Sequence, residues 1–498
     1  MSRSLKSKTL HGLFWSFFER VGQQGIQFII LIILARLLLP EQFGLIAMLT
    51  IFMAIAQSFI NSGFGQALIQ KKNATHVDEC SIFYFNIFVG FLAAGLLCLA
   101  APWIADFYNQ PLLTPLTRVL SLNLIINAFG LVQTTLLTKH IDFKTQLKVS
   151  MIATFLSGTI GVTMAFKGFG VWSLVAQSLS SNLFRTALLW VFHRWRPAWA
   201  FSYASLRIMF AFGSKLLCAS LIHTIFDNMY LIVIGKVFSA GDLGFYSRAK
   251  RIQQLPVMNI STSVGRVSFP VFSSIQEDKA RLKRGVRKAL TTLAMINFPM
   301  MIGLAIVARP LVIVLLTDKW LPCVPYLQLH CAVGALYPLH VINLNVLIAQ
   351  GRSDLNLRIN ILKNAMRIVA LVITLRWGID AIIYGQIAVS LLTYVVNSHY
   401  TAKLIDYPIQ EQVGDILPYL GVAVTMGVGV HAIHYTGLAN NVLLLTTLQI
   451  LSGAALFMVL CAALRLQVFV EIWQMAKIKI LLFLCVWRQR ILGQRLNR

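Results

Sequence analysis

Residues 212–276 decide the fold of this chain. They read FGSKLLCASLIHTIFDNMYLIVIGK (212–236), VFSAGDLG (237–244) and FYSRAKRIQQLPVMNISTSVGRVSFPVFSSIQ (245–276). The two apolar segments are each long enough to cross a bilayer, and the short turn between them predicts a helical hairpin. Both segments also carry charged residues. A charge at bilayer depth costs at least about 2.5–3.5 kcal/mol on insertion scales. These charged residues therefore predict that the protein has a hydrated interior.

The composition of the whole chain is that of a polytopic, all-α membrane protein. Of its 498 residues, 57% are hydrophobic and only 12% are charged, and the mean hydropathy is +0.74. A soluble domain cannot bury so much apolar surface. The apolar runs are continuous, which excludes the alternating pattern of a β-barrel. About fourteen runs have spanning length. They lie approximately at 13–35, 44–68, 81–104, 115–137, 147–166, 171–193, 208–234, 244–270, 289–316, 325–349, 356–376, 380–402, 414–436 and 441–463.

Lysine and arginine are distributed unequally between alternate connections. The N-terminus, the connections after even-numbered runs and the tail hold about 26 of them, and the other connections hold about 7. Basic loops stay in the cytoplasm, so both termini are predicted to be cytoplasmic. Topology and contact with anionic lipid thereby account for the net charge of +26, and nucleic acid is not expected as a partner.

The predicted spans contain a large excess of basic residues. About ten basic residues lie within them, against two acidic residues, Glu19 and Asp227. Pairing inside the protein cannot neutralise this excess, so the pattern predicts a water-filled cavity that attracts anions. The basic residues are Arg20, Arg185, Lys215, Arg248, Lys250, Arg251, Arg266, Arg358, Lys363 and Arg367.

A faint repeat at a spacing of 200 residues divides the chain. The segment ARLLLPEQFG (35–44) aligns with GKVFSAGDLG (235–244). The simplest organisation is two six-helix bundles related by an axis along the membrane normal, with the substrate site between them. The predicted parts are an N-terminal bundle at 1–205, a C-terminal bundle at 206–403, an additional two-helix hairpin at 404–464 and a basic amphipathic cytoplasmic tail at 465–498.

Polar residues share one face in each of two predicted helices. Glu19, Arg20 and the glutamines that follow them fall within an arc of about 140° at ~100° per residue. This face fits either a cavity wall or a hydrogen-bonded seam between helices. Lys215, His223 and Asp227 form the second face. It fits either a structural ion pair between Lys215 and Asp227 or a cavity in which Asp227 or His223 titrates.

Arginines form a third face. Arg248, Arg251 and Arg266 lie on one stripe of the helix at 244–270. Three arginines on one face suit a planar oxyanion such as phosphate or carboxylate. The alternative is that they contact lipid phosphates or extend toward the membrane surface. In the helix at 356–376, Arg367 lies deep enough to line a cavity.

No catalytic or metal-binding motif accompanies these charges. The sequence lacks GxxxxGK[ST], HExxH, GxSxG and any cluster of cysteine and histidine with metal-ligand spacing. Glu19 and Asp227 are the only acidic pair within the spans, and both have basic neighbours. We therefore predict that the chain is not an enzyme and has no catalytic residue, metal or cofactor.

Three longer motifs carry a family resemblance: LARLLLPEQFGLIAM (34–48), LGFYSRAKRIQQLPVMNISTSVGRVSFPVFSSIQED (243–278) and LVIVLLTDKWLPCVPYLQL (311–329). They resemble the colanic-acid exporter group of the polysaccharide transporters, a branch of the multidrug/oligosaccharidyl-lipid/polysaccharide (MOP) flippase superfamily. The resemblance extends to about residue 464. It implies a MATE-like fold with two six-helix bundles. It also implies that alternating access carries an undecaprenyl-pyrophosphate-linked oligosaccharide across the bacterial inner membrane, for exopolysaccharide or lipopolysaccharide synthesis.

The resemblance also implies roles for individual residues. In such relatives, arginine and lysine residues of the cavity contact the pyrophosphate and acidic sugars. Independently of the resemblance, the intramembrane titratable residues predict that coupling to a proton or sodium gradient would use Glu19 or Asp227, with His223 as a further candidate. The expected partners are the lipid-linked substrate, membrane lipids, and polysaccharide polymerase and export machinery. The residues that match the cationic cavity are Arg20, Lys215, Arg248, Arg251, Arg266 and Arg367.

Two other functions compete with transport of this substrate. A MATE-like drug or cation antiporter should have a net acidic site, and the spans here are strongly basic. A membrane-embedded polysaccharide polymerase usually displays a sizeable periplasmic loop. No connection on the predicted periplasmic side exceeds roughly a dozen residues, which is an ordinary connection length. The flippase is therefore the leading hypothesis.

Overall fold

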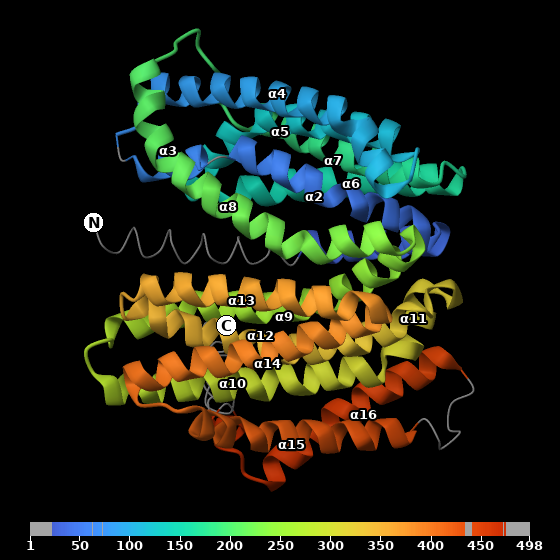
Figure 1. Ribbon diagram of the computed structural model, residues 1–498, viewed down its shortest axis with the longest axis vertical. Coiled ribbons are helices and arrows are strands. Elements are labelled where there is room, and N and C mark those ends of the chain that lie inside the picture. The colour runs from blue at the N-terminus through green and yellow to red at the C-terminus, as the bar shows by residue number, and fades with distance from the viewer. Residues whose placement is uncertain (1–21, 62, 72, 434–440, 472, 475–498) are drawn as a thin grey trace, which may run out of the picture. The chain divides into compact units, whose positions relative to one another are not determined.

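The computed structural model describes residues 22–61, 63–71, 73–433, 441–471 and 473–474, and it contains no strand among them. The described residues fold almost entirely into helices (Figure 1). In chain order these are Gly22–Leu37, α2 (Pro40–Asn61), α3 (Phe64–Gln70), α4 (His76–Tyr108), α5 (Leu113–Lys139), α6 (Phe143–Phe166), α7 (Val171–Phe192), α8 (Tyr203–Val237), α9 (Ala240–Ser274), α10 (Lys279–Ile306), α11 (Ala308–Leu316), η1 (Asp318–Trp320), α12 (Cys323–Ala349), α13 (Ser353–Thr374), η2 (Leu375–Trp377), α14 (Gly378–Ile405), α15 (Ile409–Ile433) and α16 (Val442–Ala463).

The predicted all-α membrane architecture is confirmed. In the described part of the chain, ten helical stretches are long and apolar enough to cross a membrane. One stretch, Ser353–Ile405, runs through 53 residues and contains two predicted spans, because α13, η2 and α14 follow one another without a break. The arginine-bearing helix α9 is not among the ten. The total of fourteen spans remains a prediction.

The segment at 212–276 forms two helices joined by a short turn, as the sequence predicts. Helix α8 ends at Val237 and α9 begins at Ala240. In the turn, the Ser239 hydroxyl donates to Asp242 Oδ2 at 2.7 Å. Helix α8 begins before the apolar run, because the Ser202 side chain caps it by accepting from the backbone N–H of Ser205. Helix α8 therefore begins earlier in the chain than the apolar pattern indicates.

A capping box fixes the start of α4. The Thr75 side chain accepts from the backbone N–H of Asp78 at 3.3 Å, and Asp78 Oδ2 accepts from the backbone N–H of Thr75 at 2.8 Å. Lys71 Nζ lies 2.7 Å from the same carboxylate. Side-chain caps of this kind each contribute about 1 kcal/mol to stability. The polar residues between predicted spans thus define where the helices begin.

The chain divides into two compact units, Met1–Ser247 and Arg248–Arg498, so the division falls inside α9. The domains predicted at 1–205 and 206–403 remain predictions. In the first unit α4 packs on α5, α6 packs on α7, and α8 lies along α2 (Figure 1). Small residues allow close helix contacts, as where Gly158 faces Ile30.

Helix α2 and the first turns of α9 cross at two glycines that are 200 residues apart. A Cβ atom on Gly44 would lie 1.7 Å from the carbonyl oxygen of Ala240, and one on Gly244 would lie 2.1 Å from the carbonyl oxygen of Pro40. Pro40 and Ala240 are themselves 200 residues apart. The contact is therefore reciprocal, as a two-fold relation between repeats requires. It supports the repeat found in the sequence.

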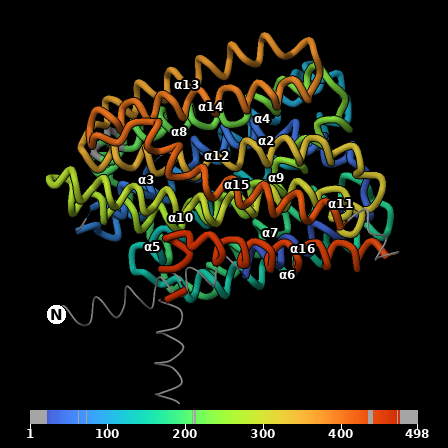
Figure 2. The backbone as a smooth tube through the Cα atoms, turned by 90° about the horizontal axis from the view of Figure 1, so that it is seen from below, coloured from blue at the N-terminus to red at the C-terminus, as the bar shows by residue number. Residues whose placement is uncertain are grey.

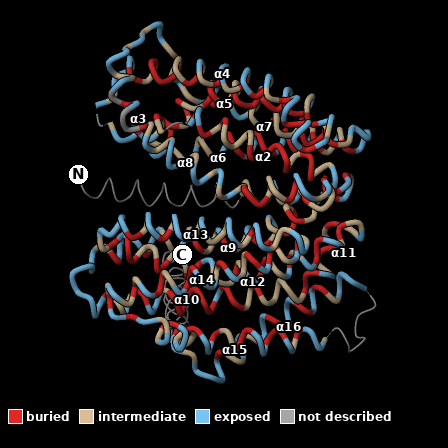
Figure 3. Tube along the Cα trace, in the orientation of Figure 1, coloured by how far each residue is buried: buried red, intermediate tan, exposed pale blue. Residues whose placement is uncertain are grey.

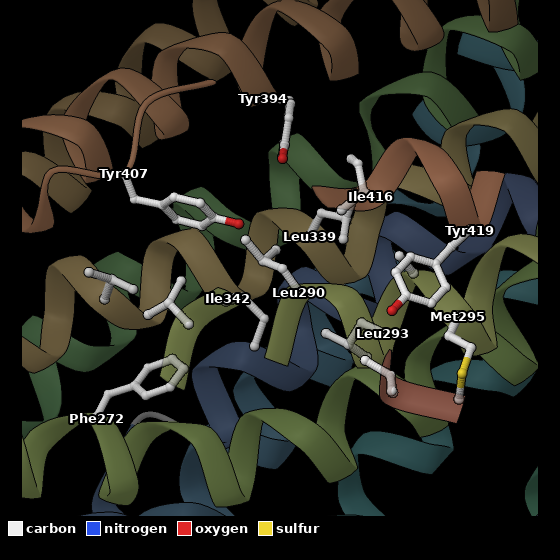
Figure 4. Packing of buried hydrophobic residues seen from close by; sticks show 14 of the residues in the cluster. Phe272, Leu290, Leu293, Met295, Leu339, Ile342, Tyr394, Tyr407, Ile416 and Tyr419 are labelled. Carbon is white, nitrogen blue, oxygen red and sulfur yellow. The ribbon is translucent and has the colours of Figure 1, made fainter. Parts of the chain in front are cut away.

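The second unit is built around α10 and α12. Helix α10 packs on α12 and α15, and α14 packs on α12 and α13 (Figure 2). Its core joins side chains such as Leu293, Leu339, Ile342, Ile416 and Tyr419 (Figure 4). Helices α15 and α16 occupy the stretch in which the additional hairpin is predicted, and α15 lies against α10. The contacts of α15 with α10 therefore attach this hairpin to the second unit.

Ion pairs reinforce the contact between α10 and α15. Lys283 Nζ lies 2.6 Å from Glu411 Oε2 and also donates to the carbonyl oxygen of Asp406. One turn further along α10, Arg287 pairs with Asp415, which also accepts from the Tyr407 hydroxyl at 2.7 Å. These pairs lie at the ends of the helices and fix how α15 is placed on α10.

Reversing one of these charges should weaken the second unit. Lys283→Glu places a carboxylate beside Glu411, so we expect a lower melting temperature. For a partly exposed pair, the free energy of unfolding should fall by an amount on the order of 1 kcal/mol. The double variant Lys283→Glu/Glu411→Lys should recover most of the loss. Thermal unfolding in detergent measures both. Equal destabilisation of the single and double variants would show that the pair does not stabilise the contact.

Candidate functional site

The predicted site residues that the structure describes fall on three helices. Glu19 and Arg20 lie outside the described residues. The helix α8 belongs to the first unit, whereas α13 and the arginines of α9 belong to the second. The structure thus carries charged side chains within apolar helices of both units. Their positions are Lys215, His223 and Asp227 on α8, Arg248, Arg251 and Arg266 on α9, and Arg367 on α13.

The polar face predicted on α8 forms. His223 Nδ1 lies 3.2 Å from Asp227 Oδ2, one helical turn along, and both side chains are more than half exposed. Lys215 is exposed on the same helix. Asp227 thus has His223 as a neighbour one turn away on the same helix. Because charge against lipid is costly, we infer that this face of α8 borders water or protein.

The three arginines of α9 lie in different environments. Arg248 is only 4% exposed, whereas Arg251 and Arg266 are exposed. The guanidinium of Arg248 lies over the fully buried ring of Trp320, with its Cζ atom 5.1 Å from the ring centroid. A cation over an indole face is stabilised by the quadrupole of the ring. Arg248 therefore joins α9 to the η1 turn, in addition to any role in binding an anion.

A pocket of about 360 Å³ opens between α9 and α12. Arg266 lines it, and so do Thr262 and Tyr337. Within the described residues Arg266 makes no ion pair, and the Asn345 side-chain N–H group, next to Gly265, is buried without a hydrogen-bond partner. Two donors that lack acceptors suit an oxyanion. The complete lining is Met258, Ser261, Thr262, Gly265, Arg266, Tyr337 and Val341.

Helix α13 has one polar side and one apolar side. Lys363 Nζ donates to Asn360 Oδ1 at 2.9 Å, and the Asn360 amide donates to the carbonyl oxygen of Asn356. Arg367 is partly buried one turn beyond Lys363. Large aliphatic residues such as Ile361 and Val372 are exposed along the other side. Much of α13 is coloured as exposed in Figure 3. The apolar side suits lipid, and the polar side presents two cations.

A buried polar network on α12, α14 and α15 was missed by the sequence analysis. The side-chain oxygen of Gln412 accepts from Tyr394, Ser398 and Asn343 at 3.0, 3.1 and 3.3 Å. All four side chains are nearly inaccessible. The available signal was the spacing of Tyr394 and Ser398, which lie four residues apart in an apolar run. Such spacing indicates one helix face, but it does not identify the facing helix.

Among the described residues, no group of three or more histidine, cysteine, aspartate or glutamate side chains could hold a metal ion. The pocket between α9 and α12 and the polar side of α13 present arginine, lysine, amide and hydroxyl groups. These groups donate hydrogen bonds to anions and to sugar hydroxyls.

Comparisons with known proteins agree with these features. Residues 33–325 match the family model described as "Polysaccharide biosynthesis protein". The lipopolysaccharide biosynthesis protein WzxC of Escherichia coli K12 is 30% identical over 376 residues, which cover 74% of this chain and 76% of that protein. The teichuronic acid biosynthesis protein TuaB of Bacillus subtilis is 32% identical over 60% of this chain and 62% of its own length.

The fold also has a solved counterpart. The structure titled "Lipid II flippase MurJ, inward closed conformation" superposes with a TM-score of 0.73 over 91% of this chain and 98% of that chain, at 13% identity. An inward-facing multidrug resistance MATE transporter of the MOP superfamily gives a TM-score of 0.60 over 77% of this chain and 95% of that chain, at 14% identity. These likenesses concern the fold alone, and they confirm the expected MATE-like architecture.

Proposed function

The chain belongs to the polysaccharide biosynthesis protein family, and we propose that it is a flippase for an undecaprenyl-pyrophosphate-linked oligosaccharide. The substrate would be a repeat unit of exopolysaccharide or lipopolysaccharide. The names of the relatives and the flippase fold support this proposal. The chain is a multi-pass membrane protein, and we propose that it lies in the bacterial inner membrane with both termini in the cytoplasm.

One observation carries the proposal: cations far outnumber acids on the described apolar helices. Asp227, the acidic residue predicted within these spans, is paired with His223. On helices of the second unit, Arg266 lines an open pocket, Lys363 Nζ donates to Asn360, and Arg367 is partly buried one turn beyond Lys363. Such donors bind phosphate oxygens, and a pyrophosphate headgroup supplies several. We propose that alternating access moves this headgroup past them.

A drug or cation antiporter is not favoured by this arrangement, because a cation would meet repulsion from the same residues. A polymerase is not favoured either. Consecutive helices are joined closely, as where α8 ends at Val237 and α9 begins at Ala240. A turn as short as this one leaves no room for a catalytic loop between α8 and α9. Polysaccharide polymerase and export machinery are proposed as partners of the transporter.

Loss of the predicted cations should abolish function in cells. Arg20→Ala and Lys215→Ala are expected to lose complementation of a flippase-null strain at normal protein level, since each removes a charge that would contact the anionic headgroup. The matched control is Lys167→Ala, at the C-terminal end of α6, which should complement fully. Wild-type complementation by both cavity variants would contradict the assignment of these two residues.

A further inference from the structure

The pocket between α9 and α12 has both hydrogen-bond donors and an acceptor on its walls, and an oxyanion uses only the donors. Arg266 lines the pocket and donates through its guanidinium. The buried Ser261 also lines it, and its hydroxyl donates to the carbonyl oxygen of Val257 at 2.7 Å. The Ser261 oxygen is therefore left to accept a hydrogen bond. An ionised phosphate has no hydrogen to donate, so Ser261 suits a ligand that also carries hydroxyl groups.

A second donor lies beside the pocket. The side-chain N–H group of Asn345 is buried and hydrogen-bonds to no described residue. Buried polar groups nearly always have a partner, so this donor points to an acceptor on a ligand. The approach is at Gly265, which lines the pocket, because a Cβ atom there would lie 3.7 Å from Asn345 Nδ2. A ligand oxygen that enters beside Gly265 would accept from this amide.

The remaining walls of the pocket are aromatic and apolar. Tyr337 is 40% exposed, and Val341 follows it one turn later on the same face of α12. From α9, Met258 adds an exposed thioether side chain. Carbon–hydrogen groups pack on aromatic rings and thioethers by dispersion. A pyranose ring has an apolar C–H face and an edge of hydroxyl groups, so it matches both the Tyr337 ring and the polar groups.

The size and depth of the pocket limit what it can hold. Its volume is about 360 Å³, near the lower end of the ~300–1,000 Å³ range of small-molecule sites. One sugar ring with its phosphate suits such a volume, whereas a repeat unit of several sugars does not. Tyr337 lies at the middle of α12, which is long and apolar enough to cross a membrane. Substrate sites of transporters lie near this depth.

We propose that this pocket is a sugar-phosphate subsite, which binds the first sugar of the lipid-linked substrate together with the phosphate attached to it. Tyr337 packs against the C–H face of the ring, Ser261 accepts from a sugar hydroxyl, and Arg266 binds the phosphate. The inference rests on the proposed function for its natural ligand. It adds that the pocket recognises the sugar as well as the phosphate, so the first sugar determines which substrates bind well.

The test compares ligands that differ only in the sugar. Full-length protein in detergent is titrated by calorimetry at about pH 8, where phosphate groups are ionised because their second pKa is about 6. The probes are inorganic phosphate, free glucose, and the 1-phosphates of glucose, galactose and N-acetylglucosamine. We expect at least one sugar phosphate to bind about tenfold more tightly than inorganic phosphate. If none of the three binds more tightly than inorganic phosphate, the proposal is overturned.

Variants separate the contact with the ring from the contact with the phosphate. Tyr337→Ala should lose the gain from the sugar and bind inorganic phosphate as wild type does, which also shows that the variant is folded. Tyr337→Phe keeps the ring and should keep the gain. Ser261→Ala removes the acceptor and should weaken sugar-phosphate binding about fivefold, with phosphate binding unchanged.

The matched control is Tyr384→Ala, which removes an exposed tyrosine of α14 and should bind every probe as wild type does. A gain from the sugar that is as large in Tyr337→Ala as in Tyr384→Ala would also overturn the proposal.

The same protein separates this inference from the proposed function. If wild-type protein moves lipid-linked oligosaccharide but binds sugar phosphates no better than phosphate, the subsite is wrong and the flippase stands. If the gain depends on Tyr337 and no lipid-linked oligosaccharide moves, the flippase is wrong and the sugar-phosphate subsite stands.

Discussion

Gly44→Ala is expected to abolish transport and lower the melting temperature. The added methyl carbon would sit 1.7 Å from the carbonyl oxygen of Ala240, closer than any two such atoms approach. The obstacle is backbone, so no side-chain rotation can relieve the clash, and α2 must move away from α9. Overpacking of this kind typically costs about 1–3 kcal/mol. Gly244→Ala should behave in the same way, because its methyl would lie 2.1 Å from the carbonyl oxygen of Pro40.

Gly95→Ala is the matched control, since nothing lies within 4 Å of its would-be Cβ in the middle of α4. It should be neutral, or more stable by up to about 1 kcal/mol through helix propensity. Thermal unfolding in detergent and complementation of a flippase-null strain would be measured for all three variants. If Gly44→Ala and Gly244→Ala behave like Gly95→Ala in both assays, the close contact between α2 and α9 does not matter for stability or transport.

Arg266→Ala is expected to reduce transport by roughly 10- to 100-fold with little loss of stability. Arg266 is exposed in the pocket between α9 and α12 and has no ion pair within the described residues, so its removal breaks no such native contact. A hydrogen bond to a charged group contributes about 1.5–3 kcal/mol, and each 1.4 kcal/mol corresponds to about tenfold in affinity. Initial transport rates at low substrate concentration measure the effect.

Two variants sharpen this result. Arg266→Lys keeps the charge but loses the planar two-point contact with an oxyanion, so it should transport at an intermediate rate. Arg376→Ala removes an exposed arginine in the η2 turn and should transport like wild type. Equal rates for Arg266→Ala and Arg376→Ala would exclude Arg266 from the substrate path.

The sequence predicted the helices well because apolar runs of spanning length have few alternatives in a membrane. Helices α8 and α9, with a short turn between them, form where the segment at 212–276 indicated. The helix period also placed Lys215, His223 and Asp227 on one polar face, and the structure pairs the last two. These features depend on residues close together in the chain, which is why pattern alone could identify them.

The surroundings of individual charges could not be predicted in this way. Arg248, Arg251 and Arg266 share a periodic stripe, yet Arg248 is buried because Trp320, some seventy residues later, lies beneath it. Tyr337 and His340 lie in an apolar run, so nothing in the local pattern indicated that one lines a pocket with Arg266 and the other contacts α14. Tertiary contacts determined these roles.

The most direct measurement follows a labelled lipid-linked oligosaccharide across a membrane. Purified protein would be reconstituted into liposomes that carry an undecaprenyl-pyrophosphate-linked repeat unit with a fluorescent sugar. A membrane-impermeant quencher then reports which leaflet holds the label. The flippase account predicts that the protected fraction exchanges rapidly with wild-type protein, and much more slowly with Arg266→Ala or without protein. Exchange no faster with wild-type protein than in protein-free liposomes would contradict it.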